Sequence, residues 1–458
     1  MKKWWSVLAV FLLLMVFSAQ TPQQEARPQF VPGEVVVKFK TATPGDRTAS
    51  LASMGLTMSD SVAGDSIFVV KVEAGKDVMQ AVESLKNKAN IEYAEPNYLY
   101  YAFDTPNDPD FNRLWGMNNT GQTGGTADAD IDAPEAWDVT TGDTSIIVGV
   151  IDTGVDYKHP DLAANMWTNP GEDAWSDPND PNTGNNIDDD NNGYIDDWRG
   201  WDFANDDNDP FDDNGHGTHV SGTIGGAGDN GLGVAGVNWK VKIMPLKFLT
   251  GSGSGSLSAA IEAINYANSF GVNLTNNSWG GGGRSQALED AIRAADQANS
   301  LFVAAAGNNG TDNDDPSKPN YPSNYDVPNV LAVAATDHKG DRALWGSGGG
   351  TPGLCGCNGG TPGGDPPGSN YGATKVDLGA PGKDIYSTTP NNTYSTFSGT
   401  SMATPHVAGV AALTLAKFPN LTDTQLKDKL MNSVEPSPGL QGKTVTGGVI
   451  NALKAVSN

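Results

Sequence analysis

The chain has 458 residues and is strongly acidic, with a net charge of −26 at neutral pH. This length is sufficient for a large hydrophobic core and for two domains, and the negative charge would repel a polyanion such as nucleic acid. We therefore expect no nucleic-acid partner, and calcium is the more natural counter-ion. The two cysteines, Cys355 and Cys357, are too few for a disulfide framework, so an incidental pair or a local loop closure is the simpler interpretation.

Residues 1–19 have the pattern of a secretory signal peptide. Two lysines precede an apolar run over residues 4–17, and the small residues Ser18 and Ala19 suit cleavage. The run is too short for a comfortable membrane span, and the sequence has no other run of that length. The sequence therefore predicts a secreted, extracellular protein, a monomer with no membrane partner after cleavage. A retained N-terminal anchor is the alternative.

Residues 25–104 predict a small α+β unit. β-branched residues dominate segments 34–40 and 66–72, which we interpret as strands together with segment 91–94. Apolar residues recur at helical spacing within residues 77–88. The Pro-, Asp- and Asn-rich stretch at residues 105–110 then indicates a linker or a processing site.

From residue 130 onward, short apolar strands alternate with helices. The predicted strands are 146–151, 241–246, 272–278, 301–306 and 330–335, and the predicted helices are 217–226, 256–270, 285–300 and 402–417. This alternation predicts an α/β domain, in which a parallel sheet has helices on both faces. Ligand sites in such sheets lie beyond the carboxyl ends of the strands.

Two segments interrupt this alternation. Residues 172–213 contain fifteen Asp or Glu residues and a single basic residue, Arg199, so their carboxylates repel one another unless a cation is bound. Residues 347–369 are rich in Gly and Pro, contain both cysteines, and are interpreted as a surface-loop insertion of unknown purpose.

Four polar residues lie at predicted strand ends or helix starts. Asp152 ends a strand, His216 opens a helix, Asn308 follows a strand, and Ser401 comes at a helix N-terminus, where an anion is favoured. Singly, these residues have plainer interpretations, namely turn formation for Asp152 and Asn308 and helix capping for Ser401. The spacing alone does not decide between His216 and His219 as a base.

Taken together, the four segments resemble the signature blocks of the subtilisin-like serine proteases. The matching blocks, in the order that the family has them, are Asp152-Thr153-Gly154, His216-Gly217-Thr218-His219-Val220, Ala306-Gly307-Asn308 and Gly399-Thr400-Ser401-Met402-Ala403. The resemblance extends from about residue 130 to the end apart from the insertions, and is strongest to thermitase-like, calcium-binding secreted members. It implies a catalytic domain over residues 105–458.

The resemblance implies a serine endopeptidase that cleaves proteins or peptides. Ser401 would be the nucleophile, His216 the general base, Asp152 the partner of His216, and Asn308 an oxyanion donor, which leaves a structural role for His219. The unit at residues 25–104 resembles the family's inhibitory pro-domain, with a ferredoxin-like fold. The protein would then be a zymogen that cleaves itself within residues 101–107, although an accessory domain is the plainer alternative.

The resemblance also suggests a substrate cleft that binds extended peptides. The implied substrate-binding residues are Gly253, Ser254, Gly255, Leu257, Ser278, Trp279, Gly280, Ala305, Ala306, Gly307 and Asn320. Asn320 falls where the floor of the primary pocket is expected, and no carboxylate appears there. We therefore expect broad specificity with a preference for apolar or neutral residues before the cleaved bond.

Two or three structural calcium sites are expected. The first rests on the EF-hand-like spacing of Asp188, Asp190, Asn192 and Tyr194, with Asp196 or Asp197 standing in for the Glu that is missing at the twelfth position. The resemblance implies a second site at Asp202, Asp207 and Asp209. It also implies a third site formed by Asp108, Asp161 and Asn230 with the carbonyls of Leu232 and Val234.

Three other classes of protein remain to be weighed against the protease. A catalytically silent scaffold on the same fold is disfavoured because every catalytic position is filled. An esterase would use the same groups, and hydrolysis of casein against that of a p-nitrophenyl ester would separate the two activities. A dinucleotide-binding enzyme needs a glycine fingerprint after the first strand, which residues 152–155 do not provide.

Overall fold

The computed structural model describes residues 30–40, 44–53, 55–63, 66–73, 75–99, 105–345 and 367–457. The predicted signal peptide, most of the expected processing segment and both cysteines lie outside these residues. The chain divides into two units, Met1–Ala102 and Phe103–Asn458, and each is described by itself. In the described part of the chain, no helix combines the length and apolarity that crossing a bilayer requires.

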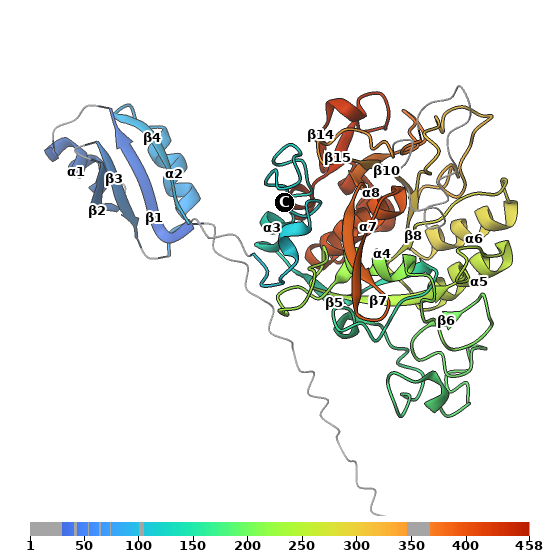
Figure 1. Ribbon diagram of the computed structural model, residues 1–458. Helices are drawn as coiled ribbons and strands as arrows, with labels where there is room; N and C mark the ends of the chain where they lie inside the picture. The colour runs from blue at the N-terminus through green and yellow to red at the C-terminus, as the bar shows by residue number, and fades with distance from the viewer. Residues whose placement is uncertain are drawn as a thin grey trace, which may run out of the picture. The chain divides into compact units, whose positions relative to one another are not determined.

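The N-terminal unit is a four-stranded antiparallel sheet with two helices (Figure 1). Its elements are β1 (Phe30–Phe39), α1 (Pro44–Ala52), β2 (Leu56–Ala63), β3 (Ile67–Val72), α2 (Val78–Lys86) and β4 (Ile91–Tyr98). The strand order β2-β3-β1-β4 and the βαββαβ chain order define a ferredoxin-like fold, as predicted. Sequence analysis missed α1 and β2, which have few large apolar residues.

The second unit is built on a nine-stranded sheet of order β14-β15-β11-β10-β9-β8-β5-β7-β6. All neighbouring strands in this sheet are parallel except β14 and β15. The strands are β5 (Gly142–Asp152), β6 (Trp201–Asp202), β7 (Lys240–Lys247), β8 (Leu274–Asn277), β9 (Leu301–Ala305), β10 (Val330–Thr336), β11 (Leu378–Pro381), β14 (Val434–Pro436) and β15 (Gly448–Ile450). The five predicted strands correspond to β5, β7, β8, β9 and β10.

Helices cover both faces of this sheet, as the apolar strands require (Figure 1). The helices are α3 (Ala133–Trp137), α4 (His216–Gly225), α5 (Leu257–Ser269), α6 (Gln286–Gln297), α7 (Thr400–Lys417), α8 (Asp423–Met431) and α9 (Ala452–Val456). Alternate residues of β9 point to opposite cores: Leu301 and Val303 pack with α4 and α7, whereas Phe302 and Ala304 pack with α5 and α6.

The chain reverses its direction of travel across the sheet at β5. Strand β5 lies between β7 and β8, so the later strands β8 to β11 extend to one side of it and β7 and β6 to the other. The carboxyl end of such a switch strand is where open α/β sheets place their ligand sites. The hairpin β12 (Ile385–Thr389) and β13 (Thr393–Phe397), which packs on α4, precedes α7. Short 3₁₀ turns span Phe111–Arg113, Ala163–Asn165, Pro181–Thr183 and Pro438–Leu440.

Candidate active site

Asp152 and His216 form a short hydrogen bond at the switch point. Asp152 is the last residue of β5 and is fully buried, and its Oδ1 accepts the Nδ1–H of His216 at 2.7 Å. His216 is the first residue of α4, which begins unusually close to the strand end. A β-carbon at Gly217 would lie 2.1 Å from the carbonyl oxygen of Gly154, so this approach requires glycine.

The charge of Asp152 sets the protonation behaviour of His216. Burial alone would lower the pKa of His216, but the charge and hydrogen bond of Asp152, aided by the charge of Asp212, raise that pKa above its ordinary value. An imidazole held in this way can take a proton and remain stabilised as an imidazolium.

The other two histidines near the predicted catalytic segments are structural. His219 is completely buried, its Nε2 lies 3.0 Å from the carbonyl oxygen of Ile385, and burial and the charge of His216 lower its pKa to about 3. His406 is also buried, its Nδ1 lies 2.8 Å from the Met402 carbonyl oxygen, and burial lowers its pKa to about 4. Neither side chain is suited to act as a base at neutral pH.

Ser401 is the second residue of α7, a helix that is buried from Thr400 to Leu415. Its Oγ donates to the carbonyl oxygen of Ser278 at 3.0 Å, while the Oγ of Ser278 donates to the carbonyl oxygen of Ser401 at 2.8 Å. Ser401 is therefore held by two hydrogen bonds to Ser278, the residue that follows β8.

Pro405 explains why Ser278 is needed there. The predicted helix begins at residue 402, but α7 begins earlier, at Thr400, and contains Pro405 in its interior. Proline has no N–H, so the carbonyl of Ser401, four residues earlier, lacks its usual helical donor. The hydroxyl of Ser278 takes that place.

Asn308 is oriented by α7. Its Oδ1 accepts from the backbone N–H of Thr400 at 2.8 Å and from the Thr400 hydroxyl at 3.1 Å, which identifies the Nδ2 end of the amide as the donor. A β-carbon on Gly399 would lie 3.6 Å from each of Asn308 Nδ2, Asn308 Oδ1 and the backbone nitrogen of Ser401. The Asn308 amide and the Ser401 N–H are therefore neighbours at the N-terminus of α7, where an anion is favoured.

His216, Ser401 and Asn308 line one open cleft with a volume of about 780 Å³. The same cleft is lined by all but one of the predicted substrate-binding residues, namely Gly253, Ser254, Gly255, Leu257, Ser278, Trp279, Gly280, Ala305, Gly307 and Asn320. The exception is Ala306, which is fully buried and packs against Ala334 and Val376. The expectation that Ala306 contacts substrate is therefore not supported.

The pocket beside Asn320 is polar but uncharged. The Nδ2 of Asn320 donates to the carbonyl of Ala305 at 3.3 Å and to the hydroxyl of Ser323 at 3.1 Å, which fixes the side chain. A β-carbon at Gly280 would lie 3.1 Å from the same nitrogen, so glycine keeps this end of the cleft open. Apart from His216, the described residues that line the cleft are uncharged.

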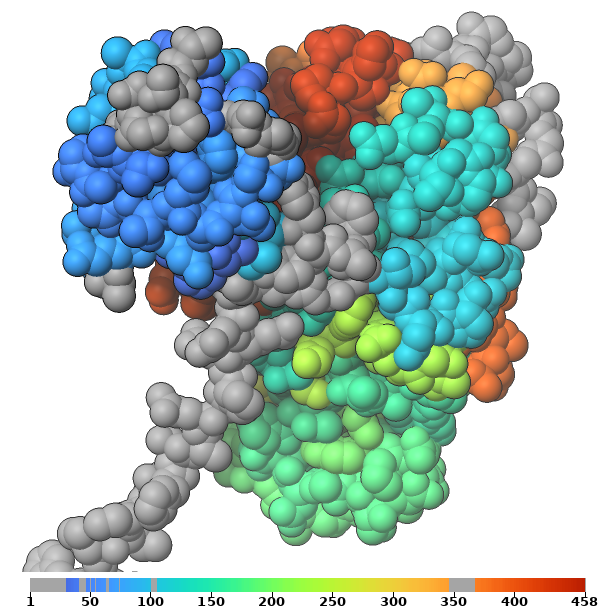
Figure 2. All heavy atoms as spheres, turned by 90° about the vertical axis from the view of Figure 1, so that its left-hand side faces the viewer, coloured from blue at the N-terminus to red at the C-terminus, as the bar shows by residue number. Residues whose placement is uncertain are grey.

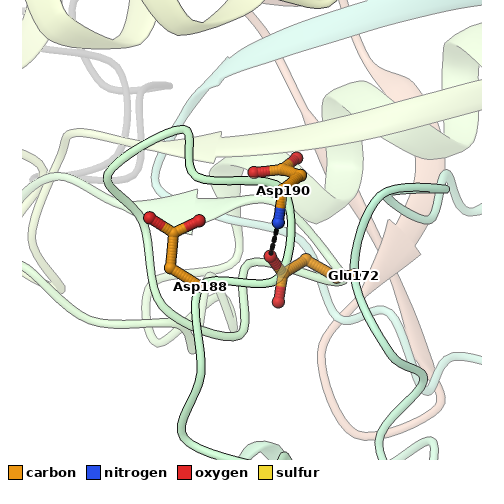
Figure 3. Close-up of side chains that lie close together, drawn as sticks. All are labelled: Glu172, Asp188 and Asp190. Carbon is orange, nitrogen blue, oxygen red and sulfur yellow. Dashed lines mark hydrogen bonds between the residues drawn. The ribbon is translucent and has the colours of Figure 1, made fainter.

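The acidic segment contains a cluster of three carboxylates (Figure 3). Oxygens of Glu172, Asp188 and Asp190 lie within 4.8 Å of one another, the one such group among the described residues. Asp188 and Asp190 were predicted, whereas Glu172 was missed, since it lies outside the EF-hand-like motif. Burial and neighbouring carboxylates raise the pKa of Glu172 to about 7. The segment lies at the surface, in green in Figure 2.

The other predicted residues of this site have different surroundings. The backbone N–H of Asn192 donates to Asp188 and Asp190, and its Nδ2 donates to Asp190 Oδ2 at 3.2 Å. Asp197 is fully buried and accepts from Tyr266 Oη at 2.5 Å, as well as from two asparagine side chains. The ring of Tyr194 packs on Trp201, Phe203 and Tyr266, which leaves its backbone carbonyl as the possible ligand.

The structure brings together the residues implied for the third calcium site. Asp161 is fully buried and accepts from Asn230 Nδ2 at 2.7 Å and from the Val234 N–H at 2.8 Å. Asp108 accepts from the backbone N–H of Asp229 at 2.7 Å. Burial raises the pKa of Asp108, and the charge of Asp161 raises it further. The Leu232 N–H bonds to Asn230 Oδ1, so the loop closes on these carboxylates.

Asp202, Asp207 and Asp209 are not gathered into a three-carboxylate group of the kind found at Glu172 in the described chain. Asp202 is buried and its Oδ1 accepts from the backbone N–H groups of Ala204 and Asn205. Asp209 accepts from Tyr157 Oη at 2.9 Å. Asp202 is therefore bound by its own loop, whereas Asp209 is bound by a tyrosine outside that loop.

Comparison with known proteins agrees with this geometry. The sequence profile of the subtilase family matches residues 143–449, and that of the fervidolysin N-terminal prodomain matches residues 18–97. The chain is 35% identical over 432 residues to a thermophilic serine proteinase from Bacillus sp. (strain AK1), covering 93% of this chain and 88% of the relative. It is 34% identical over 353 residues to thermitase from Thermoactinomyces vulgaris, covering 77% of this chain and 99% of thermitase.

Solved structures give the same result. A cold-adapted subtilisin-like serine proteinase matches with a TM-score of 0.52 and 28% identity, covering 74% of this chain and 98% of that one. A protease from Pseudoalteromonas arctica matches with a TM-score of 0.55 and 29% identity, covering 77% of this chain and 99% of that one. The chain therefore belongs to the subtilase family, among thermitase-like members, and it is a serine endopeptidase preceded by an N-terminal prodomain.

Proposed function

We propose that Asp152, His216 and Ser401 form the catalytic triad of this endopeptidase, with Asn308 and the Ser401 N–H as the oxyanion donors. The observation that carries the proposal is the 2.7 Å bond between Asp152 and His216 at the cleft that Ser401 and Asn308 also line. For attack, the hydroxyl of Ser401 turns from the Ser278 carbonyl toward His216 Nε2. His216 takes its proton and later delivers it to the leaving amine.

The specificity we propose is broad, with apolar or neutral residues preferred before the cleaved bond. The uncharged lining of the cleft supports this preference, because a basic side chain would find no carboxylate there among the described residues. A peptide library would test it. An absolute requirement for Arg or Lys would contradict it.

We also propose that the protein is secreted as a zymogen and cleaves itself before residue 107. Asn107 is bound to the catalytic unit, because its N–H donates to Asp229 Oδ1 at 3.3 Å and its Oδ1 accepts from the Gly231 N–H at 2.6 Å. The chain is thus anchored from this residue onward. N-terminal sequencing of the secreted protein should find a start within residues 101–107, and a start at Gln20 would contradict removal of the prodomain.

Calcium would be held at the two carboxylate clusters. The Oδ1 of Asp108 and the Oε2 of Glu172 are both buried, and neither has a hydrogen-bond partner among the described residues. Buried carboxylate oxygens of this kind fit a hard cation that prefers oxygen ligands. We propose one site at Asp108, Asp161 and Asn230, and one at Glu172, Asp188 and Asp190. Bound calcium would neutralise charge and fix both loops.

Labelling with a fluorophosphonate tests the triad directly. The mature protein is incubated with the reagent, digested and mapped, and we expect a single modified residue, Ser401. Ser401→Ala should lose labelling and hydrolysis, whereas Ser252→Ala, at a serine in the same cleft, should keep both. Labelling at another serine, or near-full activity of Ser401→Ala, would refute the assignment.

A further inference from the structure

A second buried carboxylate, which the proposed mechanism does not use, lies behind His216. Asp212 precedes α4 by four residues and is fully buried. Its two oxygens accept five hydrogen bonds of 2.6 to 3.0 Å, from Thr153 Oγ1, the Asn214, Gly215 and Thr218 N–H groups, and Thr218 Oγ1. The carboxylate therefore fixes the loop that carries His216 and the first turn of its helix.

Thr153 connects this carboxylate to the Asp152 strand. It directly follows Asp152, its Oγ1 donates to Asp212 Oδ1 at 2.8 Å, and the same oxygen accepts from the Gly217 N–H at 2.9 Å. One hydroxyl thus joins the residue after Asp152 to the residue after His216. This link lies beside the direct hydrogen bond between Asp152 and His216.

The charged groups around His216 come from several elements. Asp152 at the end of β5 and Asp212 before α4 both favour the imidazolium, while burial opposes it. Burial also raises the pKa of Asp212, and the hydrogen bonds from Gly215, Thr218 and Asn214, which favour its carboxylate form, oppose this rise. His219 of α4 is uncharged at neutral pH because its pKa is about 3. Lys247 at the end of β7 donates to the carbonyl oxygen of Thr153 at 2.7 Å and to Asp213 Oδ1 at 2.7 Å, so its charge is paired there.

We propose that Asp212 is a positioning residue of the endopeptidase, which holds the His216 loop against Asp152 through Thr153 and adds a second negative charge behind the imidazolium. This inference rests on the proposed role of His216 as the base. Asp212 touches neither substrate nor the reacting atoms, so it acts through His216.

The first test is the pH profile of kcat/KM for Asp212→Asn in the mature, calcium-loaded enzyme. Removing the charge should move the acidic limb to lower pH, and loosening the loop should lower kcat roughly tenfold, the effect of losing about one buried hydrogen bond at a catalytic group. The control is Asp377→Asn, at a largely buried carboxylate that accepts from the Ala332 N–H and pairs with Lys427. It should leave the profile unchanged.

An unchanged acidic limb in Asp212→Asn overturns the inference. If this variant does not fold, Thr153→Val and Thr153→Ser decide, because valine keeps the shape of Thr153 and loses its hydroxyl, whereas serine keeps the hydroxyl. We expect a lower kcat for Thr153→Val and a near-wild-type kcat for Thr153→Ser. Equal kcat values for Thr153→Val and Thr153→Ser would overturn the inference. Fluorophosphonate labelling tests the proposed triad separately from the role of Asp212, because failure to label Ser401 would refute the triad.

Discussion

The pairing of Ser278 with the carbonyl of Ser401 makes a quantitative prediction. Ser278 is 3% exposed, and its hydroxyl donates to the Ser401 carbonyl and accepts from Asn276 Nδ2 at 2.9 Å. Ser278→Ala would leave both groups buried without this partner. Each unsatisfied buried group costs about 1–3 kcal/mol, so for the two groups we expect the free energy of unfolding to fall by about 2–6 kcal/mol.

Pro405 allows this reasoning to be tested by a double-mutant cycle. Pro405→Ala restores an N–H that can donate to the Ser401 carbonyl in the ordinary helical way, so the carbonyl no longer depends on Ser278. Ser278→Ala should therefore lower the free energy of unfolding less in the Pro405→Ala protein than in the protein with Pro405. The difference between these two losses is the coupling energy, which should be about 1–2 kcal/mol.

The four proteins of the cycle would be compared in the Ser401→Ala background, which prevents autolysis and keeps the backbone carbonyl. Denaturant unfolding with saturating calcium gives each free energy of unfolding. Additive effects of the two substitutions would refute the idea that Ser278 replaces the helical donor. The same cycle with the exposed residue Ser252 in place of Ser278 should show no coupling.

Three other outcomes are expected. Asn308→Leu should lower kcat by roughly 10²–10³, the cost of removing the oxyanion-hole asparagine of subtilisin, a member of this family. The pKa of His216 is raised, and only the neutral imidazole acts as a base. The midpoint of the acidic limb of the kcat/KM profile should therefore lie at a pH above 6.5, the ordinary pKa of histidine. The folded state, in contrast, is stabilised by protonated His216. This contribution to the free energy of unfolding is complete below the unfolded-state pKa of His216 and is lost as the pH rises through its folded-state pKa. Chelation of calcium should lower the melting temperature, and a melting temperature that excess chelator leaves unchanged would contradict calcium binding. In equilibrium dialysis, Glu172→Gln should reduce the number of calcium ions bound per protein by one.

The periodicity of the sequence was sufficient to predict the central sheet. Strands β5, β7, β9 and β10 each contain an apolar run that is buried on both faces, and helices α5 and α6 each have one buried apolar stripe. Strand β8 is buried although its sequence is Leu-Thr-Asn-Asn, and it was predicted as part of the longer segment 272–278. Strands β14 and β15 were missed because each has three residues, too few to show a period. Their place in the sheet comes from tertiary pairing.

The candidate site shows the same division between local and long-range information. Asp152, His216, Asn308 and Ser401 were identifiable because each lies in a short motif at the end of an element. Glu172 and Asp212 were not, because their importance depends on partners brought close by folding. Glu172 meets Asp188 across 16 residues, and Asp212 meets Thr153 across 59. Spacing rules cannot register such contacts.

The position of Ser401, the proposed nucleophile, depends on the packing of the core. Helices α4 and α7 pack against each other and share one hydrophobic cluster with the same face of the sheet, in which Val220 and Val407 are fully buried. Both helices therefore begin at the carboxyl edge of the sheet, with His216 at the start of one and Ser401 at the start of the other. A cavity in this cluster would shift a helix as a body and so alter the geometry of the two reacting side chains. Because close-packed cores transmit such shifts, we expect core substitutions in α7 to reduce kcat even where the protein stays folded.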